Sequence, residues 1–362
     1  MKRILTYSLI FLVGVLFGFG AGYALEVIRK SAKTTSKTEV TAKPENEFTL
    51  SKKVSAAIVW WDQDEGYVSI QENKELISAI KPVWYKVKKD GTITKFTGSE
   101  DSQIIQFAKD NNIEIIPTIT NDCEPINAEK VIKSSELSSK HIEEILKLVD
   151  THDYDGIDIN YECLSGKSIR ETYSDFIKKI AAQLHTKNKL LTTSVHAKDS
   201  EYGTWEGPAT QDWKVLGENC DQVKIMTYDY HWSTSEAGEI APVTWIEETL
   251  SYAVKHIDPS KIYLGIHFYG YDWVGKKAES QTYRDVLELI DKFDPKIKKS
   301  TEGEKYFKYV SGSKSHTVYY ADSGTITARV KLANKYKIAG IGIWRLGQED
   351  PKNWEPIKNL LE

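Results

Sequence analysis

The chain lacks the features that mark several common classes of protein. Its 362 residues include three cysteines, too few for the disulfide framework of a small secreted domain. Lysine and arginine are scattered and the formal net charge is −4, so we expect no nucleic-acid partner. The first strand-like segment runs into Trp60-Trp61-Asp62-Gln63-Asp64, which is no phosphate-binding glycine loop and excludes a dinucleotide site. We see no set of residues with metal-ligand spacing, and we expect neither a metal nor a cofactor.

The few cysteines leave one pairing open. Cys123 and Cys163 each follow a predicted strand, and these two strands would be neighbours in a sheet. An oxidising compartment would allow one disulfide between them. The sequence does not show whether the geometry suits a bridge, so free thiols are our expectation. Cys220 precedes a predicted strand and is expected to be a buried thiol.

The N-terminal segment has the pattern of a membrane anchor or a signal sequence. Lys2 and Arg3 precede the uncharged apolar run Ile4–Leu25, and about 22 residues at about 1.5 Å each are long enough to span a bilayer. A signal peptide has a shorter apolar region of about 7–15 residues, although Gly22-Tyr23-Ala24 would suit cleavage. We favour an uncleaved anchor over residues 1–28. Positive N-terminal residues would then place the rest of the chain on the extracellular face, and cleavage would make it secreted.

The remaining sequence divides into a linker and one folded domain. Residues 29–52 are rich in lysine, threonine, serine and glutamate and almost free of apolar residues, which is typical of a flexible linker. Residues 53–362 are long enough for one α/β barrel, which typically takes about 250 residues, together with a small insertion. We expect this domain to be a monomer.

Short apolar segments alternate with longer amphipathic segments throughout this domain. Nearly continuous apolar strands fit a parallel sheet that is covered on both faces. Eight strands, each followed by a helix, close into a (β/α)8 TIM barrel. We expect the strands at Val54–Trp61, Lys81–Val87, Ile113–Ile119, Gly156–Tyr161, Leu190–His196, Val223–Tyr228, Ile262–Phe268 and Gly340–Arg345. We expect helices, among others, at Ser139–Thr151, Ile169–His185, Pro242–His256 and Ile326–Tyr336.

The stretch between the seventh and eighth predicted strands is too long for a single helix. Two β-rich segments, Tyr306–Val310 and Thr317–Tyr320, lie on either side of Ser311-Gly312-Ser313-Lys314, which predicts a hairpin. We therefore expect a small insertion at about residues 272–322 that forms one wall of a cleft. The alternative is an excursion that does not contact substrate.

The fourth predicted strand carries the residues that point to chemistry. In Asp155-Gly156-Ile157-Asp158-Ile159-Asn160-Tyr161-Glu162, alternate residues share a face. Asp158, Asn160 and Glu162 therefore point into the barrel, where polar side chains cost free energy unless they are paired. Barrel enzymes place catalysis at the C-terminal ends of their strands. A polar surface strand is the alternative, but the strands of such a barrel have no solvent face.

This run resembles the fourth-strand motif D-G-x-D-x-D-x-E of glycoside hydrolase family 18. Asp155, Gly156, Asp158 and Glu162 match it, and Asn160 stands where the family has its third aspartate. The resemblance implies the TIM-barrel fold and an enzyme that cleaves glycosidic bonds.

Three further segments resemble the same family, so that the likeness runs from about residue 54 to residue 350. They correspond to the family's M-x-Y-D at the sixth strand, to its seventh strand and to its last strand: Met226-Thr227-Tyr228-Asp229, Leu264–Gly270 and Gly342–Gly347. The stretch Trp205-Glu206-Gly207-Pro208 looks like the bacterial branch associated with spore and cell-wall lysis.

The family resemblance implies a retaining mechanism in which the substrate takes part. The 2-acetamido oxygen of the sugar would attack the anomeric carbon while Glu162 protonates the leaving oxygen, and Glu162 would then activate water against the oxazolinium intermediate. Asp158 beside Glu162 would help to keep the acid protonated, because close like charges raise a pKa. Tyr228 would hydrogen-bond the acetamide oxygen, and Asp229 a sugar hydroxyl.

Other residues are expected to bind substrate. Trp344 would form the floor of the sugar pocket, and Asp155, Met226, Trp61 and Tyr269 would contact substrate as well.

Less specific expectations concern the ends of other strands. One residue of each pair Trp60/Trp61 and Trp84/Tyr85 should face the cleft, but a slip of one residue exchanges the faces. His196 ends the fifth strand and is either a substrate contact or a hydrogen-bonded structural residue.

Asn160 leaves two functions in competition. An amide oxygen still accepts the acetamide N–H, but it supplies no negative charge, and losing one such interaction costs about 10²–10³ in rate. The first hypothesis is hydrolysis of β-1,4 bonds in N-acetylglucosamine polymers, with chitin-like polysaccharide or peptidoglycan as partner. The second is a lectin-like carbohydrate-binding protein with weak or no catalysis. Glu162 is retained, which favours the enzyme; a surface scaffold has no positive support.

Overall fold

The computed structural model describes residues 52–361. The expected anchor (1–28) and all of the expected linker except Lys52 lie outside these residues. Within the described part of the chain, none of the helices combines the length and the apolar character needed to cross a membrane.

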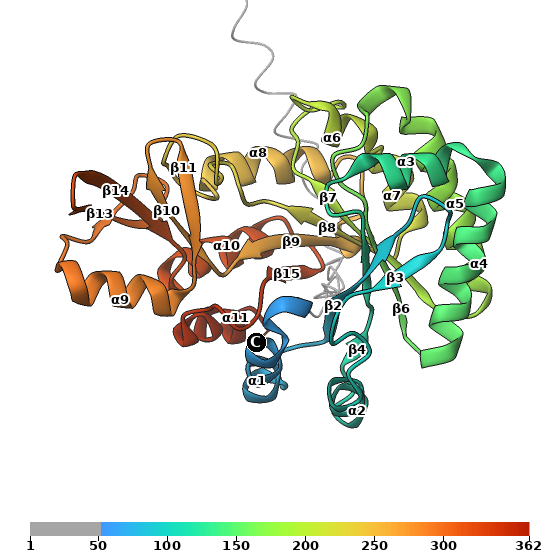
Figure 1. Cartoon of the computed structure of the whole chain (residues 1–362), viewed down its shortest axis with the longest axis horizontal. Coiled ribbons are helices and arrows are strands. Elements are labelled where there is room, and N and C mark those ends of the chain that lie inside the picture. Colours follow the sequence, from blue (N-terminus) through green and yellow to red (C-terminus); the bar gives the residue numbers. More distant parts are fainter. Residues whose placement is uncertain (1–51, 362) are drawn as a thin grey trace, which may run out of the picture. The chain divides into compact units, whose positions relative to one another are not determined.

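Eight parallel strands form a closed barrel, as the sequence predicts (Figure 1). They follow one another around the ring in chain order, and β1 pairs with both β2 and β15, which closes it. The third strand is split into β4 and β5. The barrel consists of β1 (Lys53–Val59), β2 (Ala79–Val87), β4 (Glu114–Ile115) with β5 (Thr118–Thr120), β6 (Gly156–Asn160), β7 (Leu190–His196), β8 (Gln222–Met226), β9 (Ile262–His267) and β15 (Gly340–Trp344). A short strand, β3 (Ile93–Lys95), pairs antiparallel with β2.

Helices cover the outside of the barrel and explain why the outward-facing residues of its strands are apolar. All five residues of β6 are buried, and Ile157 and Ile159 belong to the main hydrophobic core together with Phe176 of α5. The helices are α1 (Gln63–Asn73), α2 (Ser102–Asp110), α3 (Pro125–Lys133), α4 (Ser135–His152), α5 (Arg170–Thr186), α6 (Glu206–Thr210), α7 (Trp213–Asn219), α8 (Val243–Ala253), α9 (Tyr283–Phe293), α10 (Ser323–Lys335) and α11 (Trp354–Leu361).

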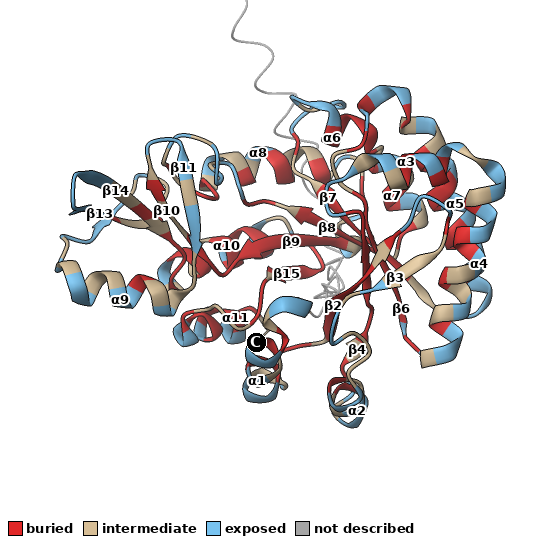
Figure 2. Ribbon diagram, viewed as in Figure 1, coloured by how far each residue is buried: buried red, intermediate tan, exposed pale blue. Residues whose placement is uncertain are grey.

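An antiparallel sheet with its own helix lies between β9 and β15. Its strands run in the order β11-β10-β14-β13-β12, and the hairpin predicted around Gly312 is β13–β14. The sequence did not reveal the second hairpin, β10–β11, or α9, whose Val286 packs on a small separate core. Figure 2 shows the contrast between the buried barrel strands and the more exposed strands of this insertion. Its strands are β10 (Gly270–Val274), β11 (Lys277–Gln281), β12 (Lys298–Lys299), β13 (Lys305–Ser311) and β14 (Lys314–Tyr320).

A buried ion pair ties the insertion to the barrel. Glu304, just before β13, is fully buried and accepts hydrogen bonds from the backbone N–H groups of Ile240 (2.7 Å) and Ala241 (2.8 Å). Arg329 of α10 donates to the same carboxylate at 2.7 Å and to the carbonyl oxygen of Thr325 at 3.0 Å. One carboxylate thus joins the insertion, the segment before α8 and α10.

Truncating Arg329 should destabilise the domain strongly. Arg329→Ala leaves the Glu304 carboxylate buried without its counter-charge, and breaking a buried pair in this way costs about 3–5 kcal/mol. Lys335→Ala is the matched control, because Lys335 lies on the same helix and its pair with Glu247 is exposed; such pairs contribute about 0–1 kcal/mol. Urea denaturation followed by circular dichroism measures both. Equal losses of unfolding free energy would contradict the assignment.

Candidate active site

The backbone at Glu162 is hydrogen-bonded to a residue that follows the neighbouring strand. Glu162 lies two residues beyond the end of β6, and its backbone N–H donates to Oδ1 of Asn121 at 2.8 Å. The amide nitrogen of Asn121 donates to the carbonyl oxygen of Glu162, also at 2.8 Å. Asn121 is fully buried directly after β5. Sequence reasoning missed this residue, and its only signal was its position after the third predicted strand.

A disulfide lies beside this contact. Cys123 and Cys163 are bonded, with their Cα atoms 5.1 Å apart, so the expectation of free thiols is wrong. The bridge became feasible because β5 and β6 are paired neighbours whose ends lie at the same edge of the barrel. Cys220 is a buried free cysteine, as expected. The residue after Glu162 is therefore covalently tied to the segment after β5 that also supplies Asn121.

The Glu162 side chain sits in a partly desolvated position with one polar neighbour. Nδ2 of Asn160 donates to Oε1 of Glu162 at 2.8 Å. Burial raises the pKa of Glu162 above its ordinary value, and the Asn160 hydrogen bond and the charge of Lys224 oppose that rise without cancelling it. The other end of the Asn160 amide, Oδ1, is buried and has no hydrogen-bond partner among residues 52–361. An acid that keeps its proton thus lies next to a free acceptor.

Asp158 has a different role from the one expected. It forms a buried pair with Lys81 at 3.1 Å and accepts hydrogen bonds from Thr192 at 2.5 Å and Thr118 at 3.1 Å. Burial alone would raise the pKa of Asp158, but the charges of Lys81 and Lys224 hold it below its ordinary value. Asp158 is therefore an ionised partner of two lysines. The raised pKa of Glu162 comes from burial, which corrects the expected repulsion between the two carboxyl groups.

Lys224 brings a second buried cation beneath the ring of Trp344. Its ammonium lies 5.6 Å from the centre of the Trp344 ring. Burial lowers the pKa of Lys224 to about 8, although the charge of Asp158 opposes this. Gly342 makes room for it, because a Cβ at that position would lie 2.6 Å from Cδ of Lys224. The sequence offered no reason to expect either lysine inside the barrel, since a lysine in a strand is usually exposed.

Tyr228 and Asp229 follow β8 close to Glu162. Tyr228 is buried, and burial together with the charges of Glu162 and Asp229 raises the pKa of its hydroxyl well above the ordinary value. Asp229 lies at the rim, where it accepts hydrogen bonds from the hydroxyls of Tyr269 and of Tyr271, the latter at 3.2 Å. The sequence analysis missed Tyr271, although Tyr269 and Trp273, two residues away on either side, lie on the same face of an extended chain.

The remaining expected substrate contacts lie at the C-terminal ends of the strands, with one exception. Met226 and Trp344 are the last residues of β8 and β15. Trp61 is 53% exposed after β1, and the Arg345 guanidinium lies 5.5 Å from its ring. Asp155 does not belong to the site: it precedes β6 at the opposite end of the barrel, where its exposed carboxylate accepts the backbone N–H of Ile115 at 2.7 Å.

The aromatic pairs that end the first two strands behave differently from each other. Trp60 and Trp61 are both exposed. Trp84 and Tyr85 are both fully buried, so the expectation that one of them faces the cleft is wrong. An irregularity in the pairing of β2 with β5 falls between Val83 and Tyr85 and removes the simple alternation of faces.

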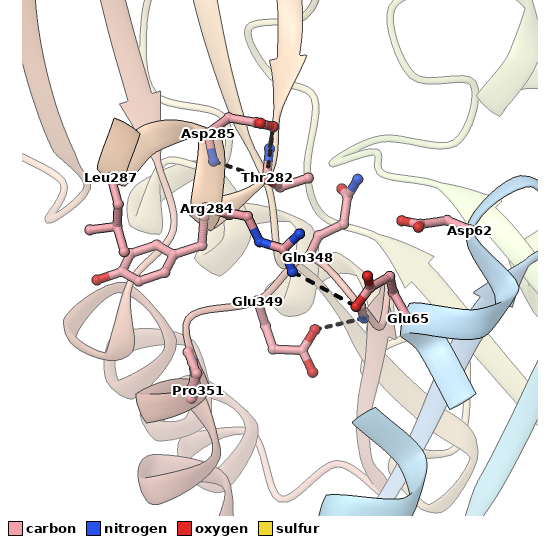
Figure 3. A pocket seen from close by; sticks show the side chains of 11 residues that line it. Asp62, Glu65, Thr282, Arg284, Asp285, Leu287, Gln348, Glu349 and Pro351 are labelled. Carbon is pink, nitrogen blue, oxygen red and sulfur yellow. Dashed lines mark hydrogen bonds and ion pairs between the residues drawn. The ribbon is translucent and has the colours of Figure 1, made fainter. Parts of the chain in front are cut away.

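A separate hollow of about 430 Å³ lies between α1, the loop after β15 and the start of α9 (Figure 3). Its charged groups contact one another: Arg284 lies 3.8 Å from Glu65, and Glu349 accepts the backbone N–H of Gly347 at 2.8 Å. Thr282 and Asp285 form the N-terminal capping box of α9. These contacts account for most of the polar lining, and the hollow contains none of the residues around Glu162.

A closed (β/α)8 barrel with a desolvated glutamic acid at the C-terminal end of one strand, and aromatic side chains at the same ends of others, is typical of a glycoside hydrolase of the TIM-barrel class. The model of the glycosyl hydrolases family 18 matches residues 44–349, and the chain belongs to this family. The predicted resemblance is thereby confirmed, and the chain is a glycosidase.

Relatives and solved structures agree with this. The chain is 30% identical over 306 residues to YvbX, an uncharacterized glycosylase of Bacillus subtilis. The matched region covers 81% of this chain and 87% of YvbX. It is 27% identical over 282 residues to the cortical fragment-lytic enzyme of Bacillus anthracis, and covers 65% of that protein and 75% of this one. The fold is similar to a chitinase from Chromobacterium violaceum (TM-score 0.80, 23% identity, 86% of this chain and 99% of the other). It is also similar to the spore cortex-lytic enzyme SleL of Bacillus cereus (TM-score 0.79, 23% identity, 85% and 74%).

Removing the Lys224 charge should extend activity to higher pH. That charge lowers the pKa of Glu162, and a general acid must be protonated to act. In Lys224→Met the pKa of Glu162 rises, so the basic limb of the kcat/KM profile should move to higher pH. The difference should fade above about pH 8, where Lys224 itself loses its proton. Lys214→Met removes an exposed charge as a control. An unmoved basic limb in Lys224→Met would show that Lys224 does not act on the acid.

Proposed function

We propose that the chain hydrolyses β-1,4 bonds of polymers that contain N-acetylglucosamine, by retaining catalysis in which the substrate's acetamide is the nucleophile. The observation that carries this proposal is a desolvated Glu162 beside Oδ1 of Asn160, a buried acceptor that has no hydrogen-bond partner among residues 52–361. A proton donor for the leaving oxygen and an acceptor for the acetamide N–H then stand side by side. No second carboxylate is needed as nucleophile in such a mechanism.

The neighbouring residues have complementary roles in this mechanism. The Tyr228 hydroxyl, whose raised pKa keeps it protonated, donates to the acetamide oxygen and orients it toward the anomeric carbon. Trp344 stacks beneath the sugar, and Asp229, held by Tyr269 and Tyr271, accepts from a sugar hydroxyl. As the leaving group departs with the proton of Glu162, the resulting carboxylate becomes the base that activates water.

Peptidoglycan is the substrate we favour over chitin. Relatives with about a quarter of their residues identical include the cortical fragment-lytic enzymes of Bacillus anthracis and Bacillus cereus. Chitinases share the fold, but the similarity at 23% identity concerns the fold alone. The action on peptidoglycan is therefore part of the proposal, to be decided by comparing both polymers.

We also propose that the domain works outside the cytoplasm. A disulfide between Cys123 and Cys163 forms and persists in an oxidising compartment. The apolar N-terminal run fits an exported chain, either tethered to the outer face of the membrane or released from it.

Replacing Glu162 should abolish hydrolysis and keep binding. Glu162→Gln removes the proton donor and preserves the size of the side chain. Release of reducing ends from chitooligosaccharides and from purified peptidoglycan should therefore fall by about 10³-fold or more, since general acid–base catalysis typically contributes about 10²–10⁴-fold. Glu124→Gln is the control, because Glu124 is an exposed carboxylate after β5. Binding without turnover by the parent chain would instead support the carbohydrate-binding alternative.

Restoring the family's carboxylate at position 160 should raise turnover. In Asn160→Asp a negative charge next to Glu162 raises the pKa of the acid and balances the positive charge that develops on the sugar. We expect kcat on chitooligosaccharides to increase, by up to about 10²-fold. Asn188→Asp adds the same charge at an exposed position and should change nothing. A kcat of Asn160→Asp at or below that of the parent would mean that the site depends on the amide.

A further inference from the structure

The rim of the barrel after β7 carries a polar side chain that the roles above do not use. His196 is the last residue of β7 and pairs in register with Met226 of β8. Thr192 of the same strand contacts Asp158 inside the barrel, so His196, four residues later, also points inward. Thr192 and Asp158 are register partners, and His196 and Glu162 are each four residues further along. His196 therefore lies at the level of Glu162, which follows the neighbouring strand β6.

His196 is not a hydrogen-bonded structural residue. Its Nε2 atom is buried and has no hydrogen-bond partner in the described part of the chain. Burial lowers the pKa of His196 to about 4, so the ring is neutral. Its backbone N–H donates to Oε1 of Gln211 at 2.8 Å, and Nε2 of Gln211 is also buried without a partner. Buried polar groups are normally paired, and two unpaired nitrogens beside a sugar site indicate that a ligand supplies the partners.

Trp205 adds an aromatic surface next to His196. The two ring centres are 4.5 Å apart at an interplanar angle of 63°, and Trp205 is 48% exposed. Gly207 lets the indole lie against the backbone, because a Cβ there would come within 2.3 Å of the ring. An aromatic ring with a few placed polar groups beside it is the usual composition of a small-molecule site.

The position of His196 and Trp205 relative to Glu162 indicates which part of the substrate they would contact. Trp344 ends β15 and Glu162 follows β6, and these strands lie on opposite sides of the ring, with three strands between them in either direction. A sugar that stacks on Trp344 and presents its bond to Glu162 therefore directs the leaving unit outward, over the loops that follow β5, β6 and β7. Trp205 belongs to the loop after β7.

We propose that His196 and Trp205 form the binding site for the sugar unit on the leaving-group side of the cleaved bond. Trp205 stacks on the apolar face of that unit, and the imidazole Nε2 of His196 hydrogen-bonds one of its hydroxyl or acetamide groups. A neutral imidazole and an indole suit an uncharged N-acetylated hexose and give no counter-charge to a carboxylate. This inference rests on the proposed glycosidase function and adds the substrate position that controls its specificity.

Two substrates that differ only in the leaving group test the proposal. Tetra-N-acetylchitotetraose must place sugar on the leaving side, whereas the nitrophenyl glycoside of di-N-acetylchitobiose presents no sugar hydroxyl or acetamide there. His196→Ala and Trp205→Ala should each lower kcat/KM for chitotetraose about 10–100-fold and lower it less than about 3-fold for the nitrophenyl glycoside. His196→Gln, which keeps a hydrogen-bonding group, should recover part of the loss. Trp61→Ala, on the other side of the ring, should affect both substrates by the same factor.

A binding measurement keeps the proposal testable without turnover. In the Glu162→Gln background, Trp205→Ala should weaken chitotetraose binding about 10-fold by calorimetry, with circular dichroism confirming an intact fold. Equal losses on the two substrates, or no loss on either, or unchanged chitotetraose affinity, would each overturn the leaving-side assignment. Cleavage of neither substrate by the parent chain would count against the proposed function, and the calorimetric comparison would still decide the role of Trp205.

Discussion

The interior of the barrel is organised around one ionised carboxylate that cannot be left unpaired. Asp158 lies among apolar strands, and a lone charge there would carry a large desolvation cost. Lys81 from β2, Lys224 from β8 and two threonine hydroxyls compensate it. These partners come from strands on both sides of β6, so that the charge network links several strands of the barrel. Trp344 lies directly above one of the cations of this layer.

The acid at the rim is controlled by groups other than the charge of Asp158. Because Asp158 is compensated from below, its charge is not what keeps the proton on Glu162; desolvation has that effect. The position of the acid is set separately, by the two hydrogen bonds to Asn121 and by the adjacent disulfide. Protonation and placement of the acid are thus controlled by different groups. Neither effect requires a carboxylate at position 160, where this chain has an amide and the family motif has an aspartate.

Much of the fold was predictable, because it follows from local patterns. The eight apolar segments and the alternation in the fourth strand fixed the barrel and the inward row of Asp158, Asn160 and Glu162, since a period of two leaves only one arrangement in a sheet that is covered outside. The partners of these residues were not predictable. Lys81 is 77 residues from Asp158 and Asn121 is 41 from Glu162, and no local periodicity encodes such contacts. The Asp155 position shows the limit of the motif itself, because a residue of the motif need not touch the ligand.

One pair of positions constrains how such a barrel can diverge. The Lys224 side chain occupies the volume that any side chain at position 342 would need. A descendant could therefore acquire a larger residue at 342 only after, or together with, the loss of the lysine, and a lineage that lost the lysine first would be left with a void beneath the tryptophan. Positions 224 and 342 should consequently covary across homologous sequences: a residue larger than glycine at 342 should accompany the absence of lysine at 224.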